Sequence, residues 1–311
     1  MQKKQGVYCI GESLLDIIFK DGKVMAAKPG GALLNTSVSL GLCKVPVELI
    51  TDFGLDAAGD LIAQFLQSQG VSIRYIDRYQ FGKTALALAM LDEDQDASYS
   101  FYKDFPTERL NISFPEISTE DMIAYGSIYA LSPGIREKIR SFILKGKAIG
   151  ATILYDPNFR TPHMAELKVL KPALLENISM ADLVRGSDED FLNIFGSHHG
   201  MEAYSQVKKA GCHRLIYTTR DTVELFTESL HHVFKNKTIS PLSTIGAGDG
   251  FNAGLLYYLF ASGIERKPLD KLEFPDWAAM IGMGVAFAQE ICMHYDNYIS
   301  KEFAAQVIIN S

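Results

Sequence analysis

The chain has 311 residues, of which 47% are hydrophobic and 22% are charged, an ordinary composition for a globular protein. This length suits one large α/β domain with a small appendage, or two domains. The formal net charge of −7 comes without a basic cluster, so nucleic acid is not expected as the main partner.

The sequence also bears on location. We find no signal peptide and no apolar run long enough to span a membrane. The four cysteines, Cys9, Cys43, Cys212 and Cys292, lie far apart and form no CxxC pair. Scattered cysteines of this kind are typical of reduced thiols. We therefore expect a cytoplasmic protein with no membrane partner.

Short apolar runs separated by glycine-containing breaks fill the first part of the chain. In chain order they predict a strand at 7–10, a hairpin at 15–28, a helix after Gly31, a strand at 47–50 and a helix between Asp56 and Gly70. Asp56 is a favoured N-cap residue, and Gly70 suits the left-handed position that ends a helix.

The next stretch has a different pattern. Residues 84–91 are almost all small or aliphatic, 92–96 form a polar turn, and 98–102 alternate between polar and aromatic side chains. This pattern predicts a second hairpin rather than a strand followed by a helix. Together with the hairpin at 15–28, it is expected to form a small separate sheet.

After about residue 110, strand-like runs alternate with helical patterns. The runs lie at 127–131, 152–155, 182–184, 215–218 and 223–226. This alternation predicts a doubly wound α/β fold, with a mostly parallel sheet and helices on both faces. Ligands of such sheets bind at the carboxyl ends of the strands. Polar clusters at 156–160 and 218–221 fall there, and the glycine turn at 246–248 also follows strand-like sequence, so we expect a site at this edge.

The glycine turn runs directly into a helical pattern, for which Gly263 is the expected end. Free N–H groups and the positive end of a helix dipole make such a turn an anion site. A carboxylate beside an anion site is repelled by the anion, so the presence of Asp249 at this position has to be explained. One reason is chemistry: Asp249 takes a proton from a hydroxyl while the N–H groups hold the phosphate that the hydroxyl attacks. The alternative is an ordinary helix start, with Asp249 as a cap.

A second candidate site surrounds Gly30 and Gly31. Glycine lets a ligand approach the backbone closely. Asn35 in the following helical turn offers a donor and an acceptor to a pair of sugar hydroxyls, and Asp16 offers a further acceptor. The alternative is a strand-to-helix turn with a solvated Asn35.

Common cofactor and metal signatures are missing from the sequence. The run 82–84 lacks the earlier glycine of a P-loop, and no GxGxxG follows the first strand, so a nicotinamide cofactor is not expected. The adjacent histidine pairs at 198–199 and 231–232 point their side chains in different directions, so we interpret them as surface residues rather than metal ligands.

Taken together, these features resemble the ribokinase-like (PfkB) family of carbohydrate kinases, and its fructokinase-like members in particular. The resemblance covers nearly the whole chain. In the family's order and spacing it includes the segments GES-LLD, PGGALLNTSVSLGLC, FGLDAAGDLIAQFLQSQGV, YDPNFR and STIGAGDGFNAG. It implies a single domain over residues 1–311, with a doubly wound α/β fold and a small β lid formed by about 15–28 and 82–105.

The resemblance also implies roles for individual residues. Asp249 is the expected base, with Gly246, Ala247 and Gly248 as the anion hole. The expected sugar contacts are Asp16, Gly30, Gly31, Asn35, Tyr102, Lys103 and Arg160, and Arg160 matches a family arginine that lies near the sugar or the γ-phosphate. The expected nucleotide contacts are Thr218, Arg220, Gly246, Gly248 and Asn297, and Asp190 is the expected metal-side carboxylate. ATP and Mg²⁺ are the implied cofactors, and a homodimer formed through the lid is the implied assembly.

The sequence departs from the family at three places. Ser243 stands where the family usually has Asp, which puts potassium activation in doubt. The family's Asn-x-x-Glu aligns with Ser187 to Asp190 and loses its Asn. Its Thr-x-Gly-x-x-Gly aligns with residues 218–223 and loses both glycines. Arg220 either reaches the phosphates or blocks the nucleotide.

Two hypotheses remain open because these departures all fall on the nucleotide and metal side. The first is an active ATP-dependent sugar kinase. The second is a sugar-binding protein with weak or no activity. The segment 101–103 is similar to one in fructokinases and 2-keto-3-deoxygluconate kinases, although a solvated lid strand is the simpler reading. We expect fructose as the substrate, then 2-keto-3-deoxygluconate, then ribose.

Overall fold

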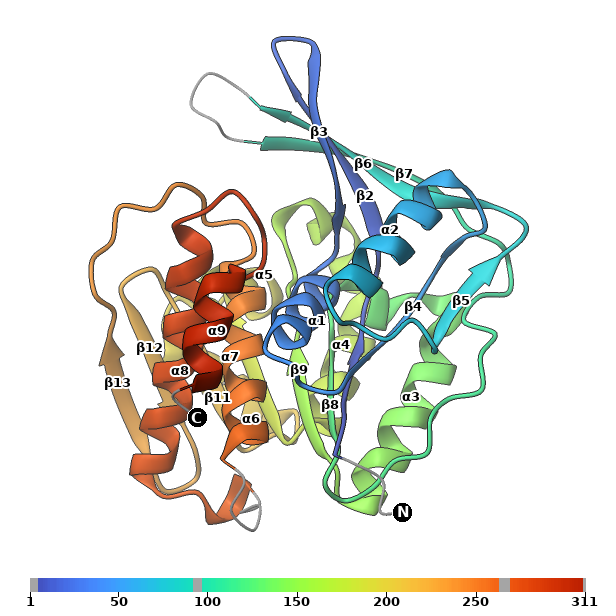
Figure 1. The fold of residues 1–311 in the computed structure, drawn as a ribbon. Helices are drawn as coiled ribbons and strands as arrows, with labels where there is room; N and C mark the ends of the chain where they lie inside the picture. The colour runs from blue at the N-terminus through green and yellow to red at the C-terminus, as the bar shows by residue number, and fades with distance from the viewer. Residues whose placement is uncertain (1–4, 92–96, 263–268, 310–311) are drawn as a thin grey trace.

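The structure, a computed structural model, describes residues 5–91, 97–262 and 269–309. Its body is a nine-stranded sheet in the order β13-β12-β11-β10-β9-β8-β1-β4-β5 (Figure 1). The strands are β1 (Val7–Ile10), β4 (Val47–Gly54), β5 (Ile76–Tyr79), β8 (Met122–Gly126), β9 (Thr152–Asp156), β10 (Leu183–Ser187), β11 (Leu215–Thr218), β12 (Thr222–Phe226) and β13 (His231–Lys235). Neighbours pair in parallel except at β12, which runs antiparallel to both β11 and β13. The predicted mostly parallel sheet is confirmed.

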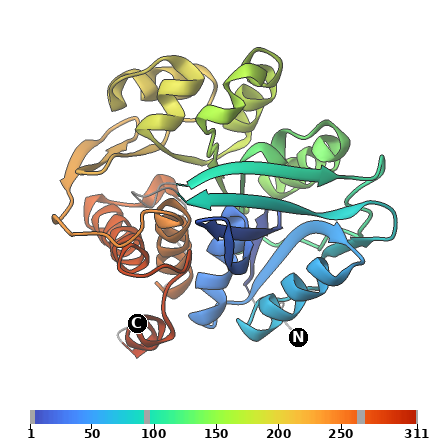
Figure 2. The ribbon, with the colours of Figure 1, turned by 90° about the horizontal axis from the view of Figure 1, so that it is seen from above.

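Helices cover both faces of this sheet (Figure 2). They are α1 (Ala32–Leu42), α2 (Ala57–Ser68), α3 (Pro133–Ile149), α4 (Leu167–Met180), α5 (Asp188–Phe195), α6 (Gly200–Lys209), α7 (Ala247–Ala261), α8 (Phe274–Cys292) and α9 (Lys301–Ile309), with short 3₁₀ turns η1 (Ile128–Leu131), η2 (Thr161–Glu166) and η3 (Leu269–Lys271). None of these, within the described ranges, has both the length and the apolar character to cross a membrane.

Alternate residues of one strand feed two hydrophobic cores. Val7 and Cys9 of β1 pack in a core with α1, α2, α7, α8 and α9, whereas Tyr8 and Ile10 pack in a second core with α3, α4, α5 and α6. Successive side chains of a strand point to opposite faces, so a central strand buried on both sides reads as a continuous apolar run. This arrangement confirms the doubly wound α/β fold.

The two predicted hairpins form a separate four-stranded sheet in the order β3-β2-β6-β7. Its strands are β2 (Leu14–Lys20), β3 (Lys23–Gly30), β6 (Lys83–Leu91) and β7 (Ala97–Asp104). Asp21 and Gly22 both take positive φ angles, 51° and 71°, as the tight two-residue turn between β2 and β3 requires. The predicted polar turn at 92–96 and the predicted helix end at Gly263 lie outside the described residues. We call this four-stranded sheet the lid.

One strand prediction is wrong. Residues 128–131 form the 3₁₀ turn η1, and the strand is β8, just before them. Ser127, with a φ angle of 58°, breaks the chain direction between the two apolar runs. Periodicity cannot separate two adjacent short apolar runs, which explains the error.

A second correction concerns the glycine turn, which does not directly follow a strand. Residues 236–246 form a loop between β13 and α7. Because β12 is antiparallel to both its neighbours, β13 runs parallel to β11 and ends at the same edge of the sheet. The loop therefore still delivers the glycine turn to the carboxyl ends of the parallel strands.

Candidate active site

The centre of the site is Asp249, in the first turn of α7. Asn35 Nδ2 in α1 donates a hydrogen bond of 2.8 Å to Asp249 Oδ2, and Thr36 Oγ1 donates one of 3.0 Å to the Asp249 carbonyl. Asp249 does not cap its own helix: the N-cap is Gly246, and no side chain caps it. These contacts argue against the alternative of an ordinary helix start, because the carboxylate is held by another helix.

Burial raises the pKa of Asp249 to about 7. The Asn35 hydrogen bond opposes that rise, and the nearby carboxylate of Asp156 adds to it. A general base works best with a pKa near the working pH, since it is then both available and able to hold the proton. The environment of Asp249 therefore suits proton transfer at neutral pH.

The glycine turn lies at the start of α7, where we expect an anion to bind. The first turn of an α-helix leaves its N–H groups without intrahelical acceptors, and here those groups belong to Ala247, Gly248 and Asp249. The Ala247 N–H donates to the Thr244 carbonyl oxygen just before the helix, over 3.3 Å. Gly246 has a φ angle of 83°, and a Cβ built on it would lie 2.7 Å from the Asn297 carbonyl oxygen. Asn297 packs against Gly246 and is not among the residues that line the cavity described below, so its nucleotide contact stays a prediction.

A buried arginine that our sequence reading missed lies beside this turn. Arg185 of β10 is only 6% exposed. Its Nη1 donates to Asp156 Oδ2 over 3.0 Å, and its Nη2 donates to Thr218 Oγ1 over 2.8 Å. Asn252 Nδ2 donates to the same Asp156 oxygen over 2.6 Å. The sequence offered one signal for this residue: an arginine in the middle of an otherwise apolar, strand-like run.

Beside this network is a cavity of about 640 Å³, a common size for small-molecule sites. Its apolar wall includes Phe251, Val285 and Ala288, and its polar lining includes the predicted residues Thr218 and Arg220. Arg220 is exposed. The cavity persists with Arg220 among its lining residues, so this side chain does not fill the space.

The turn at residues 218–223, where both family glycines are missing, is stabilised by side-chain hydrogen bonds. Thr219 Oγ1 accepts from the N–H groups of Asp221 and Thr222, over 3.2 and 2.9 Å. Asn236 Nδ2 donates to the Arg220 carbonyl over 3.1 Å. Every non-glycine residue of this turn has a negative φ angle, so the turn needs no glycine.

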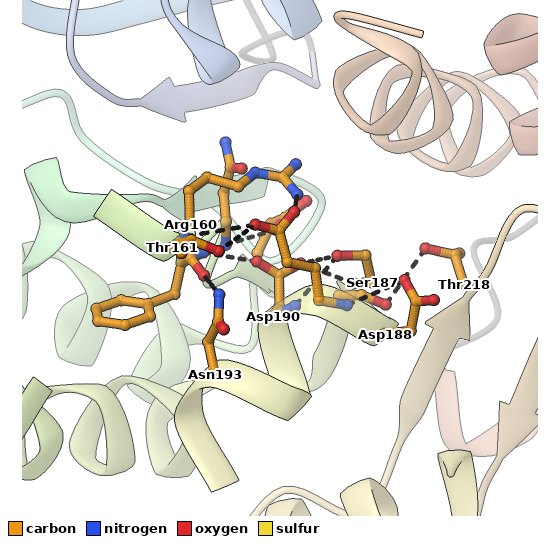
Figure 3. Close-up of polar contacts among 12 residues, drawn as sticks. Arg160, Thr161, Ser187, Asp188, Asp190, Asn193 and Thr218 are labelled. Atoms are coloured by element: carbon orange, nitrogen blue, oxygen red, sulfur yellow. Dashed lines mark hydrogen bonds and ion pairs between the residues drawn. The ribbon is translucent and has the colours of Figure 1, made fainter. Parts of the chain in front are cut away.

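Asp190 does not fit the metal role that the motif alignment implied. It is fully buried, and its two oxygens accept from the N–H of Phe159 over 2.6 Å and from the N–H and hydroxyl of Ser187, each over 2.7 Å (Figure 3). Ser187 and Asp190 form a capping box at the start of α5. Among the described residues, no group of three His, Cys, Asp or Glu side chains could hold a metal ion. We therefore derive no step through a protein-bound metal; Asp188 is the carboxylate of this segment that lines the cavity.

Arg160 lies at the cavity, as expected, but it is not free. Its Nη1 forms an ion pair of 2.8 Å with Glu189 Oε2, and about 45% of its side chain is exposed (Figure 3). The pair joins the loop after β9 to α5.

Where sugar contacts were predicted, the lid and α1 bring Asp16, Gly30 and Gly31 together. A Cβ built on Gly30 would lie 2.1 Å from Asp16 Oδ2, and one built on Gly31 would lie 2.1 Å from the Glu12 carbonyl oxygen. Gly31 also has a φ angle of 132°, which side chains disfavour. Burial raises the pKa of Asp16 to about 6. Both glycines are therefore needed for the close approach of these segments.

The lid register corrects the prediction for Tyr102. Asp16 pairs with Ala87, and Ala87 pairs with Phe101, so these three side chains share one face. Tyr102 therefore lies on the opposite face, where it is 58% exposed. Lys103 shares the face of Asp16, but its Nζ binds both carboxylate oxygens of Glu12, over 2.7 and 2.9 Å.

We expect Gly30→Ala to weaken sugar binding selectively. The added methyl must displace the Asp16 carboxylate, and a lost hydrogen bond to a charged group costs about 1.5–3 kcal/mol, or roughly 10- to 100-fold in the sugar dissociation constant. Titration calorimetry with the sugar measures it. Gly134→Ala is the control, because a methyl there meets only one atom within 4 Å. Unchanged sugar affinity in Gly30→Ala contradicts the role of Asp16.

A buried carboxylate with a pKa near 7 lies beside a helix N-terminus, at the carboxyl edge of a doubly wound sheet and next to a ligand-sized cavity. This arrangement suits the class of enzymes that transfer a phosphoryl group to a hydroxyl. Comparison with known proteins agrees: the model of the "pfkB family carbohydrate kinase" matches residues 4–296. The chain therefore belongs to the pfkB family of carbohydrate kinases, and it is a sugar phosphotransferase.

Individual relatives are distant in sequence but similar in fold. A fructokinase of Vibrio alginolyticus is 23% identical over 80% of this chain and 82% of its own length. A putative sugar kinase of Pyrococcus horikoshii is 26% identical over 88% and 87%. Among solved structures, a double mutant of the fructokinase of Vibrio cholerae O395, bound to fructose, ADP and potassium, aligns with a TM-score of 0.83 at 18% identity, over 98% of each chain. An aminoimidazole riboside kinase of Salmonella enterica, complexed with aminoimidazole riboside and an ATP analogue, aligns with a TM-score of 0.81 at 17% identity, over 98% of this chain and 100% of its own.

Proposed function

We propose that this protein transfers the γ-phosphoryl group of ATP to a hydroxyl of an uncharged sugar, with fructose as the first candidate. The observation that carries the proposal is the Asp249 carboxylate, held by Asn35 at the point where the lid side meets the anion hole. The carboxylate is poised by its raised pKa to accept a hydroxyl proton near neutral pH.

The proposed reaction uses these residues in order. Asp16 and the backbone around Gly31 hold the sugar under the lid, and Asn35 Oδ1, a buried oxygen without a partner in the described structure, accepts a sugar hydroxyl. Asp249 takes the proton of the attacking hydroxyl. The new O–P bond forms as the bond to ADP breaks, and the N–H groups of the first turn of α7 stabilise the transferred phosphoryl group.

ATP is proposed as the donor because the cavity carries basic and apolar walls suited to a nucleotide with phosphates. Mg²⁺ commonly reaches such sites bound to the phosphates and to water, with few protein ligands. This mode agrees with the absence of a metal-binding cluster from the described residues.

The charge of the sugar side favours a neutral substrate. Three basic side chains border it, and each has a carboxylate partner: Lys28 with Asp296, Lys103 with Glu12, and Arg160 with Glu189. A sugar acid such as 2-keto-3-deoxygluconate would have to displace one of these pairs. Fructose and ribose would not, so we place both ahead of the acid.

A coupled assay of ADP formation over a panel of sugars tests the proposal. We expect turnover with ATP on fructose or another neutral sugar. Turnover restricted to 2-keto-3-deoxygluconate would overturn the charge argument. Sugar binding by calorimetry, without turnover and without binding of an ATP analogue, would instead support the sugar-binding protein.

We expect little dependence on potassium. Ser243 Oγ accepts from the Ile245 N–H over 3.2 Å and brings no charge to the loop before the anion hole. Replacing KCl by tetramethylammonium chloride at equal ionic strength should change kcat by less than about twofold, whereas Ser243→Asp should introduce a dependence. Strong potassium activation of the unmodified enzyme contradicts this expectation.

We also propose a homodimer formed through the outer face of the lid. That face, opposite Asp16, exposes Val24 and Tyr102, 61% and 58% accessible. Pairing two such faces would hide apolar surface and lid edges. Light scattering should give twice the chain mass, and Val24→Glu should reduce it to one chain. Val169→Glu on α4, at an even more exposed position, is the control. A monomeric wild type contradicts the proposal.

Finally, we propose a cytoplasmic location. The four cysteines are all free and buried, as expected for a protein of a reducing compartment.

A further inference from the structure

The guanidinium of Arg185 lies against the anion hole. A Cβ built on Gly248 would be 2.7 Å from Arg185 Nη1 and 3.4 Å from its Cζ. Asp156 and Thr218 hold the two terminal nitrogens, and the ring of Phe251 lies 5.3 Å from Cζ. Nε is buried without a partner in the described structure. The group is therefore fixed in orientation and still has unused hydrogens.

Without a bound anion, the position of the Arg185 guanidinium is electrostatically unfavourable. The first turn of α7 already carries the positive end of the helix dipole, equivalent to about half a charge, and a buried cation beside it is repelled. Asp156 supplies one compensating charge, but it also accepts from Asn252. Arg160, which also acts on the Asp249 carboxylate, is paired with Glu189. A negatively charged group in the cradle would relieve this repulsion.

We infer that Arg185 is a catalytic residue whose guanidinium contacts the phosphoryl group during its transfer, and that Asp156 and Thr218 are positioning residues that hold it there. This inference rests on the proposed function. Arg185 keeps its proton throughout: Asp249 receives the hydroxyl proton, the O–P bond to the sugar forms, and the P–O bond to ADP breaks. Arg185 donates hydrogen bonds to the phosphoryl oxygens, whose negative charge is redistributed as the group moves.

Steady-state kinetics of Arg185→Gln test the inference, with binding measured separately. We expect kcat to fall by about 10²- to 10³-fold, as for the loss of one donor to a reacting oxyanion. In calorimetry, the variant should lose affinity for the non-hydrolysable analogue AMP-PNP more than for ADP, because only the former has the third phosphate. Arg214→Gln, at the opposite edge of the sheet, is the matched control and should behave as the wild type.

Chemical rescue separates catalysis from structural support. Guanidinium ion added to Arg185→Ala should restore part of kcat, and it should not raise the rate of the wild type. If loss of the Asp156 partner prevents folding of these variants, Arg185→Lys keeps the charge and loses the two-pronged geometry; we then expect a lower kcat and a smaller preference for AMP-PNP over ADP.

A wild-type kcat and AMP-PNP preference in Arg185→Gln, or in Arg185→Lys where only that variant folds, overturns the inference and leaves Arg185 a structural partner of Asp156. Failure of the wild type to phosphorylate any sugar is a different result and counts against the proposed function. The AMP-PNP and ADP affinities of the wild type and Arg185→Gln would still report whether Arg185 meets the terminal phosphate.

Discussion

Asp249→Asn is expected to lower kcat by about 10²- to 10⁴-fold, the usual contribution of a general base. The amide keeps an oxygen that can accept the Asn35 hydrogen bond, so the geometry of α1 and α7 should survive. What it loses is the capacity to take the hydroxyl proton. A coupled assay on the sugar identified by the panel measures the effect.

The pH dependence of the wild type is part of the same prediction. Because burial raises the pKa of Asp249 to about 7, the base form is depleted below neutral pH, and kcat/KM should fall as the pH is lowered through 7. Asp16, with a pKa of about 6, protonates next and should steepen the fall. A profile that is flat between pH 8 and 5 contradicts the assignment of Asp249.

The raised pKa of Asp249 also affects stability, but in the opposite direction: lowering the pH reduces activity and increases stability. The folded protein retains a proton on Asp249 that the unfolded chain releases near pH 3.8. The stabilisation linked to this proton is fully present below pH 3.8 and is lost as the pH rises through about 7. Above pH 7, Asp249→Asn removes a buried charge. Its free energy of unfolding should then exceed that of the wild type by about 1 kcal/mol, and its Tm should be a few degrees higher. The difference should vanish near pH 4.

Asp182→Asn is the control that separates the kinetic effect from the effect on stability. Burial also raises the pKa of Asp182, but its carboxylate accepts from the Ile153 N–H at the amino edge of the sheet, far from the site in the fold. It should alter stability without altering the kinetic pH profile. An active Asp249→Asn enzyme removes Asp249 from the role of base.

Residues close together in a motif were predictable, because the chain itself places them. Asp249 follows Gly246 on the first turn of a helix, and Asn35 follows Gly31 in the same way. The contact between Asn35 and Asp249 joins residues 214 positions apart, and only the packing of α1 on α7 creates it. The sequence thus predicted each half of the candidate site, but only the fold shows that the two halves are in contact.

Other residues could not be placed from the sequence for identifiable reasons. The role of Arg185 depends on its contact with Asp156 and its proximity to Gly248, and both residues belong to other elements of the fold. Tyr102 and Lys103 are consecutive residues of one strand, so their side chains point to opposite faces, and only the pairing of β2, β6 and β7 shows that Lys103 is the one on the face of Asp16. Asp190 was different: Ser187 followed three residues later by an acidic residue is a capping-box pattern, so its structural role was readable in advance.

Gly248→Ala is expected to damage the chemistry more than the fold. The new methyl would stand 2.7 Å from Arg185 Nη1, and two hydrogen bonds prevent the guanidinium from moving aside freely. The methyl would also protrude into the cavity that Gly248 lines. We expect kcat to fall by about 10²-fold, as when an oxyanion-binding group is lost, with a modest change in Tm.

Gly246→Ala should show the reverse balance. Its φ angle of 83° strains any side chain, and the methyl would meet backbone atoms of Asn297 at 2.7–2.8 Å, which cannot rotate away. A large fall in Tm is therefore expected alongside lost activity. Gly282→Ala in α8 is the control, since nothing lies within 4 Å of its added methyl, and alanine should stabilise that helix by about 0.5–1 kcal/mol.

Parallel thermal melts and kinetics of the three alanine variants distinguish these outcomes. If Gly248→Ala keeps wild-type kcat, the phosphoryl group does not approach the face of the turn that Arg185 borders. If Gly248→Ala unfolds as readily as Gly246→Ala, the position is structural, and its close contact with Arg185 serves packing. A low kcat in a protein that melts near the wild-type temperature is the result that ties this glycine to the transferred group.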